Sequence, residues 1–340
     1  MGLNIVRTLP REQWHNYVQQ HPQGNIFHSP EMFDLFSQLK NHVPQLWAAV
    51  HSDGSIQALM TPIQITLKDG GISLLRQLTT RAVAYGSVLH EATPLGQEAL
   101  AMLLQSYNQS VGKEVIFTEL RNLADLTAAQ PILEQHGFAL EGHLNYLINL
   151  DLPLEQVMEA MGKRLRKQIR SGLNKKQVIV QPVNTVAEVR EVYDLILKSY
   201  TAAQVHLSEW EFFEGAFNAL SPQGMITFWL ARFEGQSVAA SIELPYKKTL
   251  YGWYSGVDRE FSKYYPGELL MWHVLEWGVQ HGYTIYDFGG AGKPDEEYGV
   301  REFKAKFGGE LVNYGRNSCV HRPKTLQISK LGYEIYRRFR

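Results

Sequence analysis

The chain has 340 residues, more than one hydrophobic core usually serves, so two domains are expected. Apolar residues make up 44% and charged residues 20%, as in ordinary soluble globular proteins. A formal net charge of −1 excludes a nucleic-acid binder that acts through its overall charge, and a single cysteine, Cys319, excludes an intrachain disulfide or a multi-cysteine metal site. Without a targeting signal or an apolar run of about 18 residues, the chain is predicted to be cytoplasmic and to lack a transmembrane segment.

The first half of the chain mixes strand-like and helix-like segments, as judged by the spacing of its apolar residues. In chain order these are a strand over 3–9, helices over 11–20 and 30–39, strands over 44–52, 56–67 and 81–90, a helix over 94–112, a strand over 114–120, a helix that ends near 138, and a strand over 143–152.

The second half repeats this order. It is predicted to hold a basic helix over 154–176, a strand over 177–183, helices over 186–200 and 208–220, strands over 225–235, 236–246 and 249–258, a helix over 267–282, a strand over 283–290, a glycine-rich loop, a strand over 310–316 and a basic helical tail.

The two halves are most alike where a strand leads through a loop and a helix to a glycine. Ile116 and Gly137 are 21 positions apart, and Ile285 and Gly308 are 23 apart. Glycine at each helix end suits a left-handed cap. We therefore expect two similar α/β domains, 1–152 and 153–340, each with a mixed, mostly antiparallel sheet flanked by helices. Chance similarity between two mixed halves is the alternative.

The loop YDFGGAGKP follows the last apolar strand of the second half. Asp287 ends that strand, and a carboxylate there needs a hydrogen bond or a cation. Gly289, Gly290 and Gly292 permit positive φ and close backbone approach, which suits an anion-binding nest of N–H groups. No phosphate-loop or dinucleotide fingerprint is present. The alternative is a flexible turn that Asp287 caps.

The segment YGVREFKAKFGG has the spacing of an amphipathic helix. Val300, Phe303 and Phe307 fall on one face, and Arg301 and Lys304 are neighbours on the surface. A pair of cations beside a glycine loop suits a phosphate, a carboxylate or a developing oxyanion. The alternative is a solvated helix.

Two further features carry candidate residues. Tyr254 stands near the end of a strand, where its hydroxyl could face a site, although strand aromatics more often belong to a core. GKRLRKQIRSGLNKK has seven Lys or Arg in fifteen residues, and a phosphate-binding face or a solvated helix would both explain it. The residues that share this face are Lys163, Arg166, Lys167 and Arg170. The histidines lack metal-ligand spacing, so no metal is expected.

The order LYGWYSG, YYPGELLMWHVLEWG, YTIYDFGGAGKP, YGVREFKAKFGGE resembles the Fem-type peptidoglycan bridge aminoacyltransferases, which have two tandem acetyltransferase-like (GNAT) domains. The resemblance covers most of the chain and is strongest from Trp229 to Arg316. It implies transfer of an amino acid from aminoacyl-tRNA to an amine of a lipid- or nucleotide-linked cell-envelope precursor. It also implies possible peripheral membrane contact and no cofactor.

The resemblance implies roles for individual residues. Lys304, in the pair Phe303–Lys304, would lie at the reaction centre, and the basic face of 163–170 would bind the donor. The expected substrate-binding residues are Tyr85, Arg121, Tyr254, Asp287, Gly289, Gly290, Tyr298, Arg301 and Phe303. Asp34 replaces a family lysine that helps to hold precursor phosphates, and Tyr85-Gly86-Ser87 replaces Tyr-Gly-Pro.

Two other functions stay open. An acyl-CoA-dependent N-acyltransferase acting on a sugar or polysaccharide precursor would share the fold, but the place of its pyrophosphate-binding motif reads REFSKYYPGELL, where only Gly267 remains. A non-catalytic binding protein is the third possibility, and the presence of Lys304, Tyr254 and the glycine loop argues against it.

Overall fold

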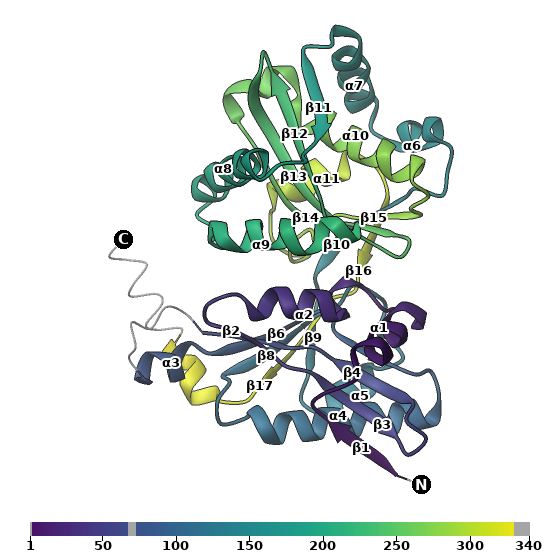
Figure 1. Ribbon diagram of the computed structural model, residues 1–340, viewed down its shortest axis with the longest axis vertical. Helices are drawn as coiled ribbons and strands as arrows, with labels where there is room; N and C mark the ends of the chain where they lie inside the picture. The colour runs from purple at the N-terminus through teal and green to yellow at the C-terminus, as the bar shows by residue number, and fades with distance from the viewer. Residues whose placement is uncertain (1, 67–72, 330–340) are drawn as a thin grey trace. The chain divides into compact units, whose positions relative to one another are not determined.

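The computed structural model describes residues 2–66 and 73–329, and these residues form two compact units (Figure 1). Unit 1 holds the described parts of 1–142 and 314–340, and unit 2 is His143–Asn313.

Unit 1 contains two sheets. The first has the order β1-β3-β4-β7 and the second has the order β2-β5-β6-β8-β17-β9. The strands of the first are β1 (Leu3–Val6), β3 (Trp47–His51), β4 (Ile56–Met60) and β7 (Val88–His90). Those of the second are β2 (His42–Pro44), β5 (Ile63–Ile65), β6 (Arg81–Tyr85), β8 (Phe117–Arg121), β17 (Arg316–Val320) and β9 (Ala139–Glu141).

The helices of unit 1 cover these sheets. They are α1 (Arg11–Gln20), α2 (Pro30–Ser37), α3 (Ser73–Thr79), α4 (Pro94–Val111) and α5 (Gln130–Gln135). The apolar face of α4 forms the centre of the core, where Leu100, Leu103 and Tyr107 are fully buried with Trp47 and Phe138.

Unit 2 contains one seven-stranded sheet with the order β11-β12-β13-β14-β15-β10-β16. Its strands are β11 (Val178–Pro182), β12 (Thr227–Phe233), β13 (Gln236–Tyr246), β14 (Thr249–Val257), β15 (Ile285–Asp287), β10 (Leu144–Asn149) and β16 (Glu310–Asn313). Its helices are α6 (Leu154–Ala160), α7 (Lys163–Lys175), α8 (Val186–Ala202), α9 (Trp210–Leu220), α10 (Pro266–Gln280) and α11 (Gly299–Ala305).

Helices cover both faces of this sheet. Successive side chains of a strand point to opposite faces, and on β12 the Phe228 ring lies 5.6 Å from Phe217 of α9, while the Trp229 ring lies 5.8 Å from Trp277 of α10. The helices α9 and α10 therefore pack on opposite sides.

The expected similarity of the two halves is visible in their strand pairing. Each unit has one parallel pair within an otherwise antiparallel sheet, β6 with β8 and β14 with β15. The glycines that end the following helices, Gly137 (φ 84°) and Gly308 (φ 77°), are both left-handed. The mixed, mostly antiparallel sheets flanked by helices confirm the predicted fold class.

The boundary between the units differs from the expected division at 152/153. Residues 143–152 carry β10, which pairs with β15 and β16 in unit 2. The chain then returns after Asn313, and β17 pairs with β8 and β9 in unit 1. Each unit is thus completed by a strand from the other half of the sequence, and pattern reasoning along the chain does not reveal such an exchange.

Several predicted elements are divided in the structure. The strand expected over 81–90 forms β6 and β7, which lie in different sheets, and the strand expected over 310–316 ends as β16 at Asn313, with Arg316 in β17. The helix expected over 154–176 is broken between α6 and α7, where Met161 and Gly162 are extended and the Gly162 N–H donates to the Lys306 carbonyl at 2.9 Å. The strand expected over 56–67 is divided at Pro62, which has no N–H to donate. Of the predicted basic tail, 323–329 is helical and 330–340 lies outside the described residues.

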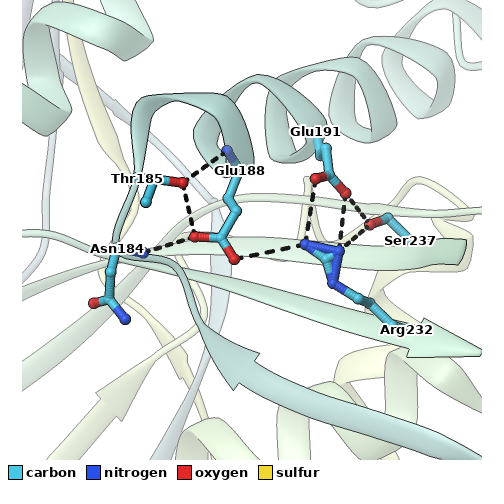
Figure 2. Close-up of polar contacts among 6 residues, drawn as sticks. All are labelled: Asn184, Thr185, Glu188, Glu191, Arg232 and Ser237. Atoms are coloured by element: carbon cyan, nitrogen blue, oxygen red, sulfur yellow. Dashed lines mark hydrogen bonds and ion pairs between the residues drawn. The ribbon is translucent and has the colours of Figure 1, made fainter. Parts of the chain in front are cut away.

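A reciprocal cap fixes the start of α8 (Figure 2). The Glu188 N–H donates to the Thr185 hydroxyl at 3.3 Å, and that hydroxyl donates to the Glu188 carboxylate at 2.9 Å. Arg232 of β12 pairs with Glu191 at 3.0 Å and with Glu188 at 3.7 Å, which ties the same helix to the sheet. Thr185 and Glu188 have the sequence spacing of a capping box, and the Thr185 hydroxyl satisfies the Glu188 N–H, one of the groups that helix starts leave without a partner.

We expect Thr185→Ala to lower the free energy of unfolding of unit 2 by about 1 kcal/mol, because an N-cap hydroxyl is lost. The hydrogen bond from Thr185 is the main cause that lowers the pKa of Glu188. The difference in unfolding free energy between the wild type and Thr185→Ala should therefore be present above the usual glutamate pKa and shrink as the pH falls below it. Urea unfolding of the wild type and the variant measures this loss of stability. The exposed Thr201 of the same helix is the control, and Thr201→Ala should cost less than about 0.5 kcal/mol; equal losses would contradict the role of the cap.

Candidate functional site

The candidate site of unit 2 lies where the parallel pair β14–β15 ends. These strands pair only from Thr249/Ile285 to Tyr251/Asp287, after which β15 ends and β14 continues to Val257. The register of β14 on β13 shifts there, because Ile242 pairs with Tyr254 and Glu243 with Gly252. Trp253 is thus the extra residue of a bulge, a device that redirects side chains next to active sites.

The N–H groups of the glycine loop are already engaged within the fold. Gly289 donates to the Asp287 carboxylate at 2.7 Å, Gly290 donates to the Asn145 side-chain oxygen at 2.9 Å, and Ala291 donates to the Leu144 carbonyl at 2.6 Å. Asn145 also donates its amide to Asp287 at 2.6 Å. The expected anion-binding nest at Gly289 and Gly290 is therefore wrong, since β10 and Asp287 take its donors.

The carbonyl groups of the same loop point to two cations on α11. Lys304 Nζ donates to the Phe288 carbonyl at 2.6 Å and to the Gly290 carbonyl. The Arg301 guanidinium donates to the carbonyls of Ala291, Lys293 and Pro294. The predicted neighbours Arg301 and Lys304 are thus both brought to the loop, and Arg301 holds its outer part in place.

Glycine is required at the turn because the loop lies against β14. Gly289 has φ 74° and Gly290 has φ 115°, which favour glycine. A Cβ on Gly289 would lie 2.6 Å from the Gly252 carbonyl oxygen. The loop is therefore a turn fitted closely against β14, and Asp287 caps it, as the alternative interpretation expected.

Burial governs the ionisation of this cluster. Burial lowers the pKa of Lys304 to about 8, although the nearby carboxyls of Asp287 and Glu243 oppose the shift. Burial also raises the pKa of Asp287, despite the hydrogen bonds from Asn145 and Gly289. An ammonium has three donors; two of those of Lys304 are on loop carbonyls, and the third has no hydrogen-bond partner among the described residues.

Sequence reasoning missed Glu243, which is 1% exposed on β13. It accepts a hydrogen bond from the buried Tyr286 hydroxyl at 3.1 Å, and burial raises the pKa of Glu243 to about 8. Gly252 leaves room for this pair, because a Cβ there would lie 2.5 Å from the Tyr286 hydroxyl. The available signal was a lone carboxylate in the apolar strand QSVAASIELPY.

Tyr254 and Tyr298 both lie near a third tyrosine, Tyr200 of α8. Tyr254 packs against Phe213 of α9, with ring centroids 5.1 Å apart, and against Tyr200 of α8 at 6.0 Å. Tyr298 lies beside Gly292 and is close enough to Tyr200 to act on its pKa, which burial raises to about 12. Tyr254 and Tyr298 are therefore linked through Tyr200, which the sequence did not single out.

The apolar face predicted for 299–307 is only partly formed. Phe303 packs on the core beside the fully buried Phe307, with rings 5.2 Å apart, so its ring is directed to the core rather than to a ligand. Val300, expected on the same face, is 44% exposed. Lys306 is exposed.

Tyr85 and Arg121 come together in unit 1. They are partners at the end of the parallel pair β6–β8, and the Arg121 guanidinium lies 4.9 Å from the centre of the Tyr85 ring. Arg121 also donates to Glu119 at 2.6 Å.

Ser87 has φ 69°, which proline does not adopt, so the replacement of proline here is structural. Asp34 forms an ion pair with Arg11 at 2.5 Å.

The four basic residues predicted to bind a donor do share a surface. Lys163, Arg166, Lys167 and Arg170 of α7 line one hollow, together with Glu159, Ser171, Asn174 and Lys175. Leu165 and Ile169 bury the opposite side of the helix. We call this surface the basic hollow. Arg166 also donates to the Glu159 carbonyl at 2.9 Å, so its guanidinium is partly committed to the fold.

The start of α10 is poorly suited to a pyrophosphate. Tyr265 occupies the cap position in a left-handed conformation, and Pro266 brings no N–H to the first turn. Glu268 places a carboxylate in that turn. Helix N-termini bind anions through free N–H groups and the positive end of the dipole, and both are weakened here.

Within residues 2–66 and 73–329, no group of three His, Cys, Asp or Glu side chains is placed to hold a metal ion. None of the described helices combines the length and the apolar content that crossing a bilayer requires.

Comparison with known proteins agrees with this architecture. Residues 160–304 match the family described as "Acetyltransferase (GNAT) domain". No curated protein matches the sequence significantly. The crystal structure of FemX is similar with a TM-score of 0.75 and 15% identity, over 96% of this chain and 99% of that one.

Two further solved structures are similar at 10% identity. The C-terminal domain of a putative lysylphosphatidylglycerol synthetase from Agrobacterium fabrum has a TM-score of 0.60 and is aligned over 93% of each chain. A tandem GNAT protein from the clavulanic acid biosynthesis pathway has a TM-score of 0.57, over 94% of this chain and 99% of that one. The chain thus has the fold of these solved structures, one of which is a tandem GNAT protein, and residues 160–304 match the acetyltransferase (GNAT) domain family.

Proposed function

We propose that the chain is an acyltransferase that forms an amide bond, moving an amino acid from aminoacyl-tRNA to an amine of a cell-envelope precursor in the cytoplasm. Lys304 is the catalytic residue. Asp287, Gly289, Gly290 and Arg301 shape the loop that holds it, and Tyr254 and Tyr298 border the acceptor. Tyr85 and Arg121 are proposed to bind substrate in unit 1. The precursor is lipid- or nucleotide-linked, with peripheral membrane contact in the lipid-linked case.

The placement of Lys304 carries the proposal. Its ammonium is fixed by the carbonyls of Phe288 and Gly290, and one donor is left. A hydrogen-bond donor that is held in place before the reaction does not have to reorient when charge develops on an ester oxygen. Such a group typically lowers the activation free energy by about 3 kcal/mol.

In the proposed reaction the acceptor nitrogen attacks the ester carbonyl of the donor. A C–N bond forms, the carbonyl oxygen becomes an oxyanion that Lys304 stabilises, and the C–O ester bond then breaks. The proton that the amine loses goes to the leaving ribose oxygen. An activated ester and a well-positioned amine need no separate nucleophile in the protein.

Two observations favour tRNA over CoA as the donor. The first turn of α10, with Pro266 and Glu268, is weak in anion-binding capacity, whereas the basic hollow on α7 offers several cations to a phosphate chain. FemX shares the fold, and a second similar structure is named for an aminoacylated lipid product.

The acyl-CoA-dependent N-acyltransferase is the second candidate. The family description of residues 160–304 and the fold shared with the clavulanic acid pathway protein support it. Lys304 would serve the same role on a thioester carbonyl.

Lys304→Met should lower kcat/KM at least about tenfold, because one electrostatic contribution to the transition state is lost. The control is Lys306→Met, which removes an exposed lysine two positions further along the chain and should leave kcat/KM within about twofold. Transfer of a labelled amino acid from charged tRNA to an amine acceptor measures both. Full activity of Lys304→Met with an unchanged melting curve would contradict the mechanism.

The activity should depend on the ammonium form of Lys304. Because the pKa of Lys304 is lowered to about 8, the protonated fraction falls as pH rises through that value, and kcat/KM should fall with it. Hydroxylamine is a suitable acceptor, since it is unprotonated over this range and adds no rising limb. A rate that stays flat or rises up to pH 9 would exclude a role for the ammonium.

The donor class can be decided by equilibrium binding. We expect charged tRNA to bind with an affinity that falls steeply with salt, and CoA not to bind. Lys167→Gln with Arg170→Gln should reduce the slope of log K against log salt by about two, one for each lost phosphate contact. Lys113→Gln, an exposed position of unit 1, is the control. Tight CoA binding without tRNA binding would overturn this donor in favour of the acyl-CoA reaction.

A further inference from the structure

A hollow in unit 1 is not explained by the activity proposed above. It is lined by Gln13, Asn16, Tyr17, Gln20, Ser55, Ile56, Gln57, Glu91 and Thr93. Every one of these residues belongs to unit 1, and none belongs to the loop or helix that carries Lys304.

One face of α1 supplies four of these side chains. Gln13, Asn16, Tyr17 and Gln20 have the spacing i, i+3, i+4 and i+7, so they project from the same side of the helix. The apolar residues Trp14 and Val18 are buried on the other side. The helix therefore has a core face of its own, and its amide face is turned to the hollow.

The turn between β3 and β4 holds two of the amides in place. Gln13 donates from Nε2 to the Gly54 carbonyl at 2.6 Å, and Gln57 donates from Nε2 to the Ser55 hydroxyl at 2.8 Å. Each side-chain amide has a carbonyl oxygen with two lone pairs besides these donors. These two oxygens are thus presented by a fixed frame, which lowers the entropy cost of binding a ligand.

Tyr17 and Glu91 provide a donor and an acceptor close together. The Tyr17 hydroxyl is buried and faces the Glu91 carboxylate. Burial, with a contribution from the Glu91 carboxylate, raises the pKa of Tyr17, so the hydroxyl keeps its proton. An alcohol group of a ligand would accept from Tyr17 while donating to Glu91.

The chemistry of the lining selects the class of ligand. Among the described residues that form the hollow there is no lysine, arginine or histidine, which disfavours a phosphate or a carboxylate. The strand at its floor, β4, lies between β3 and β7 in the sheet, so no open strand edge is offered for a peptide to pair with. Amides, hydroxyls and one carboxylate instead match a neutral ligand with several neighbouring hydroxyl groups.

We propose that the hollow between α1, β4 and the β7–α4 connection binds a neutral saccharide unit, a hexose or an N-acetylhexosamine. Recognition uses the amides of Gln13, Asn16, Gln20 and Gln57 and the pair Tyr17–Glu91.

The proposal is tested on the full chain labelled with 15N in asparagine and glutamine, by following the side-chain amide signals in NMR spectra. Glucose and N-acetylglucosamine are added separately up to tens of millimolar. One of them should shift the signals of Gln13, Asn16, Gln20 and Gln57 in a saturable way. Tyr17→Phe and Gln20→Ala should each weaken binding at least about fivefold, since each removes one hydrogen bond to the ligand.

The matched control is Gln97→Ala, which removes an exposed glutamine of α4 outside the hollow and should leave the affinity unchanged. An unchanged spectrum elsewhere verifies that each variant is folded. The proposal is overturned if neither sugar shifts these signals, if Tyr17→Phe and Gln20→Ala bind as tightly as the wild type, or if the hollow takes a triglycine peptide or spermidine in preference to both sugars.

Discussion

The contact between the Lys304 ammonium and the carbonyls of Phe288 and Gly290 organises the end of β15. Those carbonyls converge only because Gly289 and Gly290 are left-handed, and the turn is stable only because Asp287 and Asn145 take its N–H groups. Donors and acceptors of the loop are thus separated, with N–H groups directed to β10 and C=O groups directed to α11. The loop thus binds a cation through its backbone carbonyl groups, whereas a phosphate loop binds an anion through its backbone N–H groups.

The same burial gives the cluster its chemical character. A fully solvated lysine would be protonated far above neutral pH and would be free to move, whereas Lys304 is fixed and its pKa is lowered to about 8. Glu243, whose pKa is raised to about 8, is largely neutral at pH 7 and so contributes little negative charge there. Asp287 is held by Asn145 and Gly289. Few groups of this buried cluster are therefore charged. The positive charge is that of Lys304, whose third N–H has no hydrogen-bond partner among the described residues.

The sequence predicted the elements better than it predicted contacts. Apolar content and spacing identified α4, α10 and the strands β12 to β14, because these segments carry most of the buried side chains of their units. It also predicted that Arg301 and Lys304 are neighbours, since residues three positions apart lie next to each other on a helix surface. It could not show that loop N–H groups were already engaged, because their partner Asn145 lies 142 positions before Asp287. Glu243 and Tyr200 escaped notice for the same reason: burial and long-range partners define them, and neither leaves a local motif.

Asn145 lies outside the matched GNAT region, so that region alone does not build this site. The matched GNAT region begins at residue 160 and ends at Lys304, yet β10 and Asn145 precede it and β16 follows it. Without β10, the Asp287 carboxylate would lose the Asn145 amide and Gly290 would lose its acceptor. An unpaired buried carboxylate is far more costly than a lost surface contact. The loop that orients Lys304 therefore depends on a strand outside the recognisable domain, and the crossing of the chain between the two units is part of how the site is built.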